Sequence, residues 1–444
     1  DFCLSRGLGD VYKRQLHSGC GQECIDEFPQ FSFLLGDLHP HVMALPIVVL
    51  ALGIALNLLR RPSPLAFARS EWLSLLLIPI AVGSLGFANT WDLPAYLGLV
   101  LAAVLVRQLI GSPHLASPAA AGEGQTGHWW RSFDWKPLAW VAGAAIVSYL
   151  PFYVGFQSQA GGIGIVNGQT TPAEFLGHWG FLFAFAIGLL AVTVRIPYKH
   201  GLVLLGAALI IEVVTRKWLV ALMLPLAAAA LWHVWLQVKE RKWDADQAFV
   251  LGVTAAAFGL IAVCEVVFLK DTFNNRMNTI FKFYYEAWLF LAIAGAYGLH
   301  QIGQRFRKPS LHYGWLGALG LVCASLFVYP VASFYAKANE LKPAWTLDGS
   351  AHLMGSDPGD AKAINWLNAN VKQDVVVAQA TGDEYTNFGL ISTYTGLQGI
   401  LGWAGHELQW RGTWVEQPKR IGDLTTLYTT TDEAAVKNLS LIHI

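Results

Sequence analysis

Three stretches of the sequence combine acidic, imidazole or cationic side chains at the ends of long apolar runs. The first contains Glu27 and the alternating residues Asp37, His39 and His41. In an extended segment, these three side chains can converge on a divalent cation such as Mg²⁺ or Mn²⁺, or serve with Glu27 as an acid/base set. The alternative is that Asp37 caps the helix that follows. Because polar groups are costly at a membrane boundary, the pattern favours a catalytic or metal-binding role.

The second stretch is Asn89-Thr-Trp91-Asp92-Leu-Pro94, a short link between two apolar runs. A carboxylate there needs a partner or a water-filled cavity, which makes Asp92 a candidate substrate-binding residue. Trp91 is equally compatible with an interface anchor. Asp92 is equally compatible with a helix cap, because Pro94 suits the first turn of a helix.

The third stretch, residues 271–286, brings two cations beside aromatic hydroxyls and amides. This combination suits a phosphate or pyrophosphate, with Arg276 as a bidentate clamp. The alternative is a belt of cations and aromatic rings at the level of the lipid headgroups. The predicted phosphate-binding residues are Arg276, Lys282, Tyr284, Tyr285 and Asn278.

A fourth group lies near the end of the chain, where two Trp residues stand among His, Glu and Arg side chains. Trp faces stack on sugar rings, so the group predicts a sugar-binding surface, and a buried structural corner is an equal alternative. Its members are Trp403, His406, Glu407, Trp410 and Arg411.

The elements that position these residues are membrane helices. Of the 444 residues, 54% are hydrophobic and 14% are charged, against about 25% charged in soluble proteins. Thirty basic residues balance thirty acidic ones, so no net charge recruits nucleic acid. Ten windows are apolar enough to cross a bilayer as helices: 41–59, 73–88, 93–110, 137–155, 177–194, 200–215, 217–237, 248–268, 286–303 and 313–334. The composition therefore predicts a mainly α, polytopic helical membrane bundle and excludes a soluble enzyme.

Basic residues in the loops predict the orientation, because Lys and Arg accumulate on the cytoplasmic side. They follow the first, fifth, seventh and ninth windows and precede the fourth. The three stretches and the tail then face the extracytoplasmic side of a prokaryotic plasma membrane. The predicted organisation is a transmembrane domain over residues 16–335 and an extracytoplasmic α/β domain over 336–438. Residues 1–15 and 439–444 resemble translated sequencing adapters and are expected to be non-native.

Local signals in the tail support the α/β expectation. Asp357-Pro358 is a helix-start signal, and AKAINWLNANV (361–371) carries apolar residues at helical spacing. VVVAQA (375–380) is typical of a buried strand.

Five blocks of the sequence resemble the "YYY" (Chlor-Arch-YYY) family of multi-pass membrane proteins. They are EFPQFSFLLGDLHPHVMALP, FANTWDLPAY, LPFYVGFQSQAGGI, RMNTIFKFYYEAW and GWAGHELQWRG. The architecture of that family is similar to the GT-C membrane glycosyltransferases, which transfer a sugar from a polyprenyl-phosphate donor. The resemblance implies a carboxylate in the first outer loop, Asp37 or Glu27, as base or metal ligand.

The leading functional hypothesis is therefore a GT-C-type glycosyltransferase whose partners are the lipid bilayer and a polyprenyl-phosphate lipid. Asp37 is expected to be the base, with His39 and His41 assisting it or holding the metal. A transporter or flippase is the second hypothesis, and a non-catalytic assembly factor is the third. A transporter places charges near midspan in broken helices, and only Glu265 and Asp92 approach that pattern.

Overall fold

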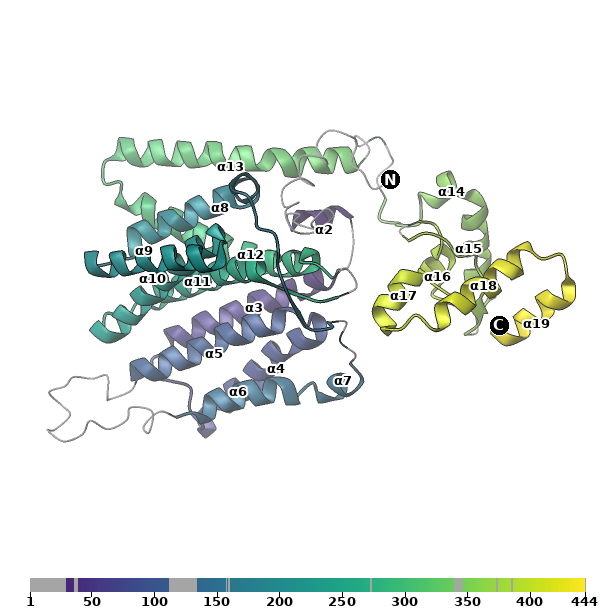
Figure 1. Cartoon of the computed structure of the whole chain (residues 1–444), viewed down its shortest axis with the longest axis horizontal. Coiled ribbons are helices and arrows are strands. Elements are labelled where there is room, and N and C mark those ends of the chain that lie inside the picture. Colours follow the sequence, from purple (N-terminus) through teal and green to yellow (C-terminus); the bar gives the residue numbers. More distant parts are fainter. Residues whose placement is uncertain are drawn as a thin grey trace. The chain divides into compact units, whose positions relative to one another are not determined.

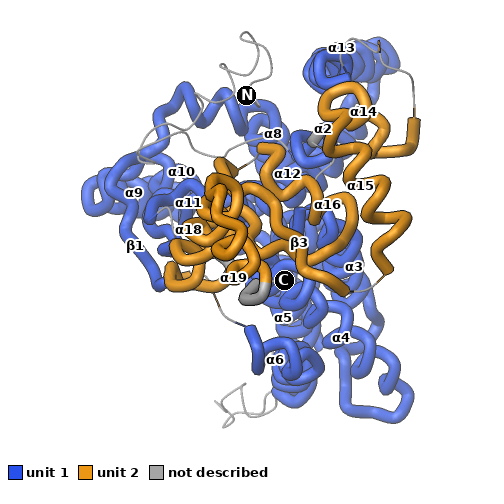
Figure 2. Tube along the Cα trace, turned by 90° about the vertical axis from the view of Figure 1, so that its right-hand side faces the viewer, with its two compact units in different colours: residues 1–156, 161–340 blue, residues 157–160, 341–444 orange. Residues whose placement is uncertain are grey.

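The chain folds into two compact units in a computed structural model (Figures 1 and 2). Unit 1 comprises Asp1–Phe156 and Gly161–Glu340, and unit 2 comprises Gln157–Ala160 and Leu341–Ile444. The structure describes residues 29–35, 39–111, 134–156, 158, 160–271, 274–338, 342, 346–372, 374–384 and 386–443.

Unit 1 is a bundle of long apolar helices with one short pair of strands. Its elements are α2 (Gln30–Leu35), α3 (Pro40–Arg60), the 3₁₀ turn η1 (Arg69–Glu71), α4 (Trp72–Ala88), α5 (Asp92–Gly111), α6 (Lys136–Val147), α7 (Leu150–Gly155), β1 (Ile163–Ile165), α8 (Pro172–Thr193), α9 (Tyr198–Thr215), α10 (Trp218–Glu240), α11 (Ala245–Val266), β2 (Val267–Leu269), α12 (Met277–Arg305) and α13 (Pro309–Lys337).

Within the described residues, eight helices are long and apolar enough to cross a membrane: α3, α4 with η1, α5, α8, α9, α10, α11 and α13. They coincide with eight of the ten predicted windows, which confirms a mainly α, polytopic membrane protein. The ninth window, 286–303, lies in α12, which begins nine residues earlier than predicted and is more polar in its first turns.

The fourth window, 137–155, was predicted as one helix and is two, α6 and α7. Pro151 explains the interruption, because its nitrogen has no proton to donate to the carbonyl one turn earlier. The Tyr149 hydroxyl at the break donates to the Ile80 carbonyl at 3.0 Å. Before the break, α6 approaches α4 closely at Gly83, where an added Cβ atom would stand 2.1 Å from the Ala145 carbonyl oxygen.

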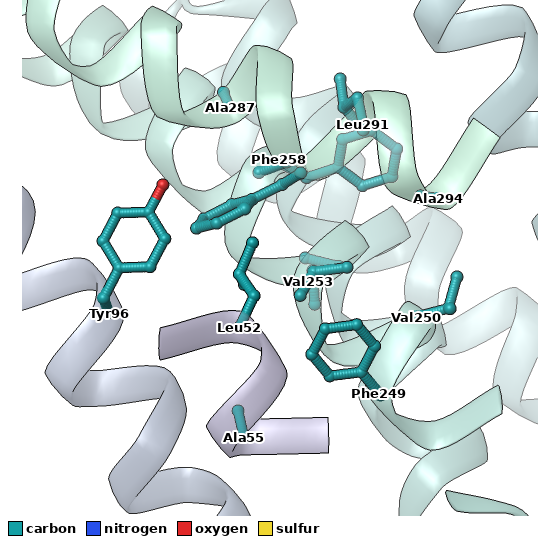
Figure 3. Packing of buried hydrophobic residues seen from close by; sticks show 14 of the residues in the cluster. Leu52, Ala55, Tyr96, Phe249, Val250, Val253, Phe258, Ala287, Leu291 and Ala294 are labelled. Atoms are coloured by element: carbon teal, nitrogen blue, oxygen red, sulfur yellow. The ribbon is translucent and has the colours of Figure 1, made fainter. Parts of the chain in front are cut away.

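The core of unit 1 lies where α3, α5, α11 and α12 meet. Figure 3 shows Leu52 of α3, Tyr96 of α5, Phe258 of α11 and Leu291 of α12 packed together. Around this core α10 packs on α11, α8 packs on α12, and α4 packs on α3 and α6. Because lipid is as apolar as these side chains, close packing rather than exclusion of water holds such helices together.

The strands β1 and β2 pair antiparallel, with Ile163 opposite Leu269 and Ile165 opposite Val267. They join the connection before α8 to the segment between α11 and α12. A capping box at Thr171 and Glu174 starts α8 at this point.

Unit 2 is mostly helical. Its elements are α14 (Leu353–Ser356), α15 (Pro358–Asn370), β3 (Val376–Val377), α16 (Leu390–Thr395), β4 (Gln398–Gly399), α17 (Ala404–Arg411), α18 (Glu416–Thr429) and α19 (Glu433–His443). The predicted helix at 358–371 is confirmed as α15. The predicted strand at 375–380 is only two residues long, and it pairs in parallel with β4. Asp357 precedes α15 as predicted, but its Oδ2 accepts a hydrogen bond from Asn387 at 2.9 Å instead of capping the helix.

Candidate functional site

Two buried polar groups lie at the end of unit 1 where α3, α5, α8 and α12 begin. We call the first the His41 cluster; it consists of His41, Asn89, Asp92 and Glu286. We call the second the Arg276 cluster; it consists of Thr170, Glu265 and Arg276. All seven side chains are buried.

The His41 cluster is built from the ends of four helices. His41 lies in the first turn of α3, Asn89 ends α4, Asp92 begins α5 and Glu286 lies in the third turn of α12. The Asn89 amide nitrogen donates to Asp92 Oδ1 at 2.7 Å and lies 2.8 Å from His41 Nδ1. Because this nitrogen can only donate, His41 Nδ1 accepts, which leaves the imidazole proton on Nε2. His41 Nδ1 is 3.7 Å from Asp92 Oδ1, so Asn89 bridges the two residues.

Glu286 completes the cluster as a second carboxyl group. It is 3% exposed, as is Asp92, and the carboxyl groups of the two residues are neighbours. Within the described part of the chain, no donor reaches either oxygen of Glu286. Tyr96, buried one turn after Asp92, lies close to both carboxyl groups. Among the described residues, Glu286 therefore has no basic side chain in ion-pair contact, and Asp92 has only His41.

Aromatic rings enclose His41. Its ring stacks between His39, at 5.1 Å between centroids, and Tyr285, at 5.3 Å. The edge of Phe281 meets both imidazoles at 5.2 Å. The predicted residues His39, His41 and Tyr285 are thus brought together, and Tyr285 acts here as a packing surface.

The predicted metal site rests on Asp37, which, like Glu27, lies outside the described residues. The His39 and His41 rings are stacked and inclined by only 8°, so their nitrogen lone pairs lie in nearly parallel planes, which does not suit convergence on one ion. Among the described residues, no three His, Cys, Asp or Glu side chains are grouped as metal ligands. The metal site stays a prediction that depends on Asp37.

The Arg276 cluster is a closed ion pair. Arg276 precedes α12, is 1% exposed and donates from Nη1 to Glu265 Oε1 at 2.7 Å. Thr170 donates its backbone N–H to Glu265 Oε2 at 3.0 Å, and its hydroxyl donates to Oε1. The guanidinium predicted to clamp a phosphate is therefore engaged by a carboxylate. A phosphate would have to open this pair to reach it.

Lys217 lies beside this ion pair, in the two-residue connection between α9 and α10. Its ammonium group donates to the carbonyl oxygens of Val166, at 3.1 Å, and Gly168. Burial lowers the pKa of Lys217, and the Glu265 carboxylate offsets part of that effect. Lys217 thus ties the connection before α8 to the start of α10.

The remaining predicted residues of the third stretch lie in two other places. Lys282 lies over the Trp91 ring, 4.1 Å from its centroid, so the second and third stretches meet here. Asn278 donates to Asp271 Oδ2 at 2.6 Å. Tyr284 is buried against Trp179, at 5.0 Å between ring centroids.

An open hollow of about 580 Å³ lies along the β1–β2 pair, a volume typical of small-molecule sites. None of the predicted site residues is among those that line it: Ile163, Gly164, Ile165, Val166, Asn167, Phe268, Lys270, Asn274 and Asn275. The hollow is lined by apolar residues together with three side-chain amides and one ammonium group. The chain continues directly from Asn275 into Arg276 and α12.

The predicted sugar-binding group of the tail forms a helix-start corner in unit 2. Trp403 precedes α17 and donates its indole N–H to the Phe388 carbonyl. Glu407 accepts from the Gly402 N–H and from Arg411 Nε, each at 2.9 Å. His406 Nδ1 is 3.5 Å from Glu384 Oε2, and the side chain of Trp410 lies outside the described residues. These contacts match the structural alternative, and the sugar-binding role stays a prediction.

Asn89 and Glu286 lie within the second and third predicted stretches, but the sequence reasoning gave neither residue a role. Glu286 had an available signal, because it opens the apolar window 286–303 and an ionisable residue in a membrane segment is by default a functional candidate. Asn89 had a weaker signal, its spacing of three residues from Asp92. Nothing in the sequence pairs either residue with His41.

The fold and these clusters define a polytopic membrane protein with ionisable groups buried in its helix bundle. Residues 8–291 match the family described as "Uncharacterized membrane protein (DUF2298)", and the chain belongs to this family. Neither a curated protein nor a solved structure matches the chain.

Proposed function

We propose that the chain is a membrane glycosyltransferase of GT-C type that takes a sugar from a polyprenyl-phosphate donor. The observation that carries this proposal is the convergence of three separate stretches on one end of the bundle. His41 comes from the first stretch, Asp92 from the second, and Tyr285 and Lys282 from the third. Carboxyl, imidazole and ammonium groups together can supply a base and a phosphate-binding cation for transfer from a phosphate-linked donor.

The reaction needs a base that takes the proton of the acceptor hydroxyl and a cation that balances the negative charge of the departing phosphate. As the acceptor hydroxyl forms its bond to the anomeric carbon, the bond between that carbon and the phosphate oxygen breaks. The hydroxyl proton passes to a carboxylate, and polyprenyl phosphate departs with the bonding electrons. Asp37 remains the predicted base, and Asp92, the described carboxylate that adjoins an imidazole, is the second candidate for that role.

Lys282 is the better-placed cation for the donor phosphate. Arg276 forms an ion pair with Glu265. The Lys282 ammonium group instead lies over the Trp91 ring and has no carboxylate oxygen within ion-pair distance among the described residues. The hollow along β1 and β2 adjoins the same segment, and its amides suit sugar hydroxyls. We therefore place the donor head group between Lys282 and this hollow.

The orientation belongs to the same proposal. Arg60, Arg195, Lys239 and Arg305 lie at the helix ends away from the clusters, where the cytoplasmic side is expected. The clusters and unit 2 then face the extracytoplasmic side of a prokaryotic plasma membrane. A cysteine at position 91 should react with an impermeant reagent in intact cells, and reaction only after permeabilisation would contradict this orientation.

A transporter or flippase is the second candidate, and Glu286 is the observation that favours it. Buried carboxyl groups inside a helix bundle are typical of proton relays in transporters. Such a protein would move a lipid-linked or polar substrate without cleaving it.

The purified full chain in liposomes, supplied with radiolabelled polyprenyl-phosphate hexoses and acceptor membranes, tests both candidates. The transferase should release polyprenyl phosphate and label the acceptor. Asp92→Asn should keep donor binding while transfer falls about 10²–10⁴-fold, the usual cost of losing a general base. Asp246→Asn is the matched control, because Asp246 pairs with Arg60 at the opposite end of the bundle. Full transfer by Asp92→Asn would remove Asp92 from the mechanism, and movement of intact donor across the bilayer would favour the transporter.

A further inference from the structure

We propose that the hollow along β1 and β2 binds a sugar that carries a carboxylate, a hexuronate, and that Lys270 and Asn275 hold this carboxylate. Such a site rests on the proposed function, because it would receive the sugar of the polyprenyl-phosphate donor. It restricts that sugar to an anionic class.

The charge that lines the hollow is positive. Among the described residues that line it, Lys270 carries the one ionisable side chain, and none carries a carboxylate. The Lys270 side chain is exposed, and no carboxylate oxygen of the described residues lies within ion-pair distance of its ammonium group. Asp271, the next residue in the chain, accepts from Asn278 at 2.6 Å and is not part of the lining. The lining therefore offers a ligand one ammonium group without a competing carboxylate.

Asn275 adds a directed hydrogen-bond donor to this lining. Its Oδ1 accepts from the backbone N–H of Met277, the first residue of α12, at 2.8 Å. Because its oxygen is engaged in this way, the amide has its two N–H groups for another partner. The half-buried side chain lines the hollow, and its Nδ2 makes no hydrogen bond to the described residues. Asn275 is therefore set to donate to a ligand there.

Ammonium and amide N–H groups without a carboxylate favour an anion over a neutral group. A sugar hydroxyl both donates and accepts, so a site for a neutral sugar gains from strong acceptors as well as donors. A carboxylate only accepts, and its hydrogen bonds to a cation are roughly twice as strong as those between neutral groups. The amides of Asn167 and Asn274 remain for the ring hydroxyls. A hexuronate matches this lining both at its carboxylate and at its hydroxyls.

Apolar side chains complete the hollow and suit the C–H face of a sugar ring. The Phe268 ring lies over Gly164, where an added Cβ atom would stand 2.3 Å from the ring. Ile163 and Ile165 are 67% and 75% exposed, so apolar surface remains uncovered in the lining. Apolar surface with a few directed polar groups is typical of small-molecule sites.

The two walls of the hollow are held in place by bonds outside it. The Gly161 N–H donates to the Lys270 carbonyl at 2.7 Å, and the Lys270 N–H donates to the Gly162 carbonyl at 2.9 Å. On the other wall, the Lys217 ammonium group donates to the Val166 carbonyl at 3.1 Å. A ligand therefore meets walls that are already formed, which lowers the entropic cost of binding.

Two donors that differ only at the sixth carbon of the sugar test this site in the full chain, reconstituted in lipid nanodiscs. Polyprenyl-phosphate glucuronate and polyprenyl-phosphate glucose share the same lipid and phosphate, so the ratio of their dissociation constants measures the effect of the carboxylate. The wild type should bind the glucuronate donor about ten- to a hundredfold more tightly, the usual value of one charge-assisted contact. Equal affinities would overturn the proposal.

Variants of the two proposed ligand residues should change this preference in a defined way. Lys270→Met should remove it and leave the affinity for the glucose donor nearly unchanged, whereas Lys270→Arg retains the cation and should keep it. Asn275→Asp keeps the oxygen that caps α12 but places a second negative charge beside the carboxylate, so it should also abolish the preference. Lys242→Met is the matched control, because Lys242 follows the opposite end of α10 from Lys217 and pairs with Glu240.

The remaining outcomes separate this site from the transferase itself. If Lys270→Met weakens both donors equally, Lys270 binds the phosphate that they share and the carboxylate site is wrong. A preference that survives in both Lys270→Met and Asn275→Asp contradicts the site as well. Preferential binding of the glucuronate donor without release of polyprenyl phosphate would remove the transferase and leave the anion site. Transfer from the glucose donor without any preference would do the reverse, and binding of neither donor would remove both.

Discussion

The His41 and Arg276 clusters lie at the same end of the bundle and are equally buried, yet they satisfy their charges in opposite ways. In the Arg276 cluster one guanidinium meets one carboxylate, and Thr170 donates to both carboxylate oxygens. In the His41 cluster the Asn89 amide donates to Asp92, and no donor from the described residues reaches either oxygen of Glu286. The comparison separates a group whose charges are paired and hydrogen-bonded from a group in which one carboxyl group has no donor among the described residues.

The physical cost of each arrangement supports this separation. A buried ion pair repays the desolvation of its charges only when the geometry is good and the remaining hydrogen bonds are made, and the Arg276 cluster meets both conditions. The His41 cluster leaves both oxygens of Glu286 without a donor among the described residues. Proteins retain such arrangements at sites where protons or ligands are exchanged.

The largest expected effect comes from breaking the ion pair. Arg276→Met should leave the Glu265 carboxylate buried without its counter-charge, which costs about 3–5 kcal/mol of stability. Thermal unfolding of the detergent-solubilised protein, followed by size-exclusion chromatography, should show an early transition and aggregation. The double variant Glu265→Gln with Arg276→Met should recover most of the loss. If Arg276→Met is stable but no longer binds donor, Arg276 is a ligand residue and the comparison fails.

A smaller effect is expected at Lys282, where a change in donor binding can be measured separately from a change in the stability of the protein. Lys282→Met keeps the length of the side chain and removes the charge above Trp91. The loss of one charge-assisted contact, about 1.5–3 kcal/mol, should weaken binding of a polyprenyl-phosphate sugar by roughly ten- to a hundredfold. Lys242→Met provides the control, because Lys242 pairs with Glu240 outside the cluster end of the bundle. Unchanged donor affinity in Lys282→Met would place the phosphate elsewhere.

The smallest effect is expected in unit 2, at the ion pair between Arg411 and Glu407. This pair is exposed, whereas the pair between Arg276 and Glu265 is buried. The Arg411 side chain is 56% exposed, so Arg411→Ala should cost only about 0.3–0.5 kcal/mol. Thermal unfolding should barely change, and sugar binding should be unaffected if the corner is purely structural. A marked loss of sugar binding would instead revive the binding surface predicted around Trp403.

The membrane fold could be predicted because apolar length is a local property of the sequence. Eight windows became span-length helices with small shifts at their ends. The predicted helix bounds were wrong in two places, where local residues break a helix or make its first turns polar. Pro151 divides the fourth window, and the polar first turns of α12 hid the early start of that helix.

The site could be predicted less well, because partners depend on packing between helices. The sequence marked Arg276 and Glu265 as notable charges, but spacing alone does not show that one neutralises the other. It also marked His41 and Asp92 as needing partners, and the structure supplies Asn89 between them. Glu286 was hidden by its position at the start of an apolar window, although its charge there was itself a signal.

The short β1–β2 pair has a consequence for the order of assembly. Its strands are separated in the chain by four spanning helices, α8 to α11, so they can meet only after all four have entered the bilayer. Thr170 and Glu265, which flank the strands, can join only at the same stage. Because contacts between such distant segments form slowly, this end of the bundle should be completed late in biogenesis. A chain arrested before β2 would carry the helices only up to α11, and Glu265 would still lack its partner Arg276.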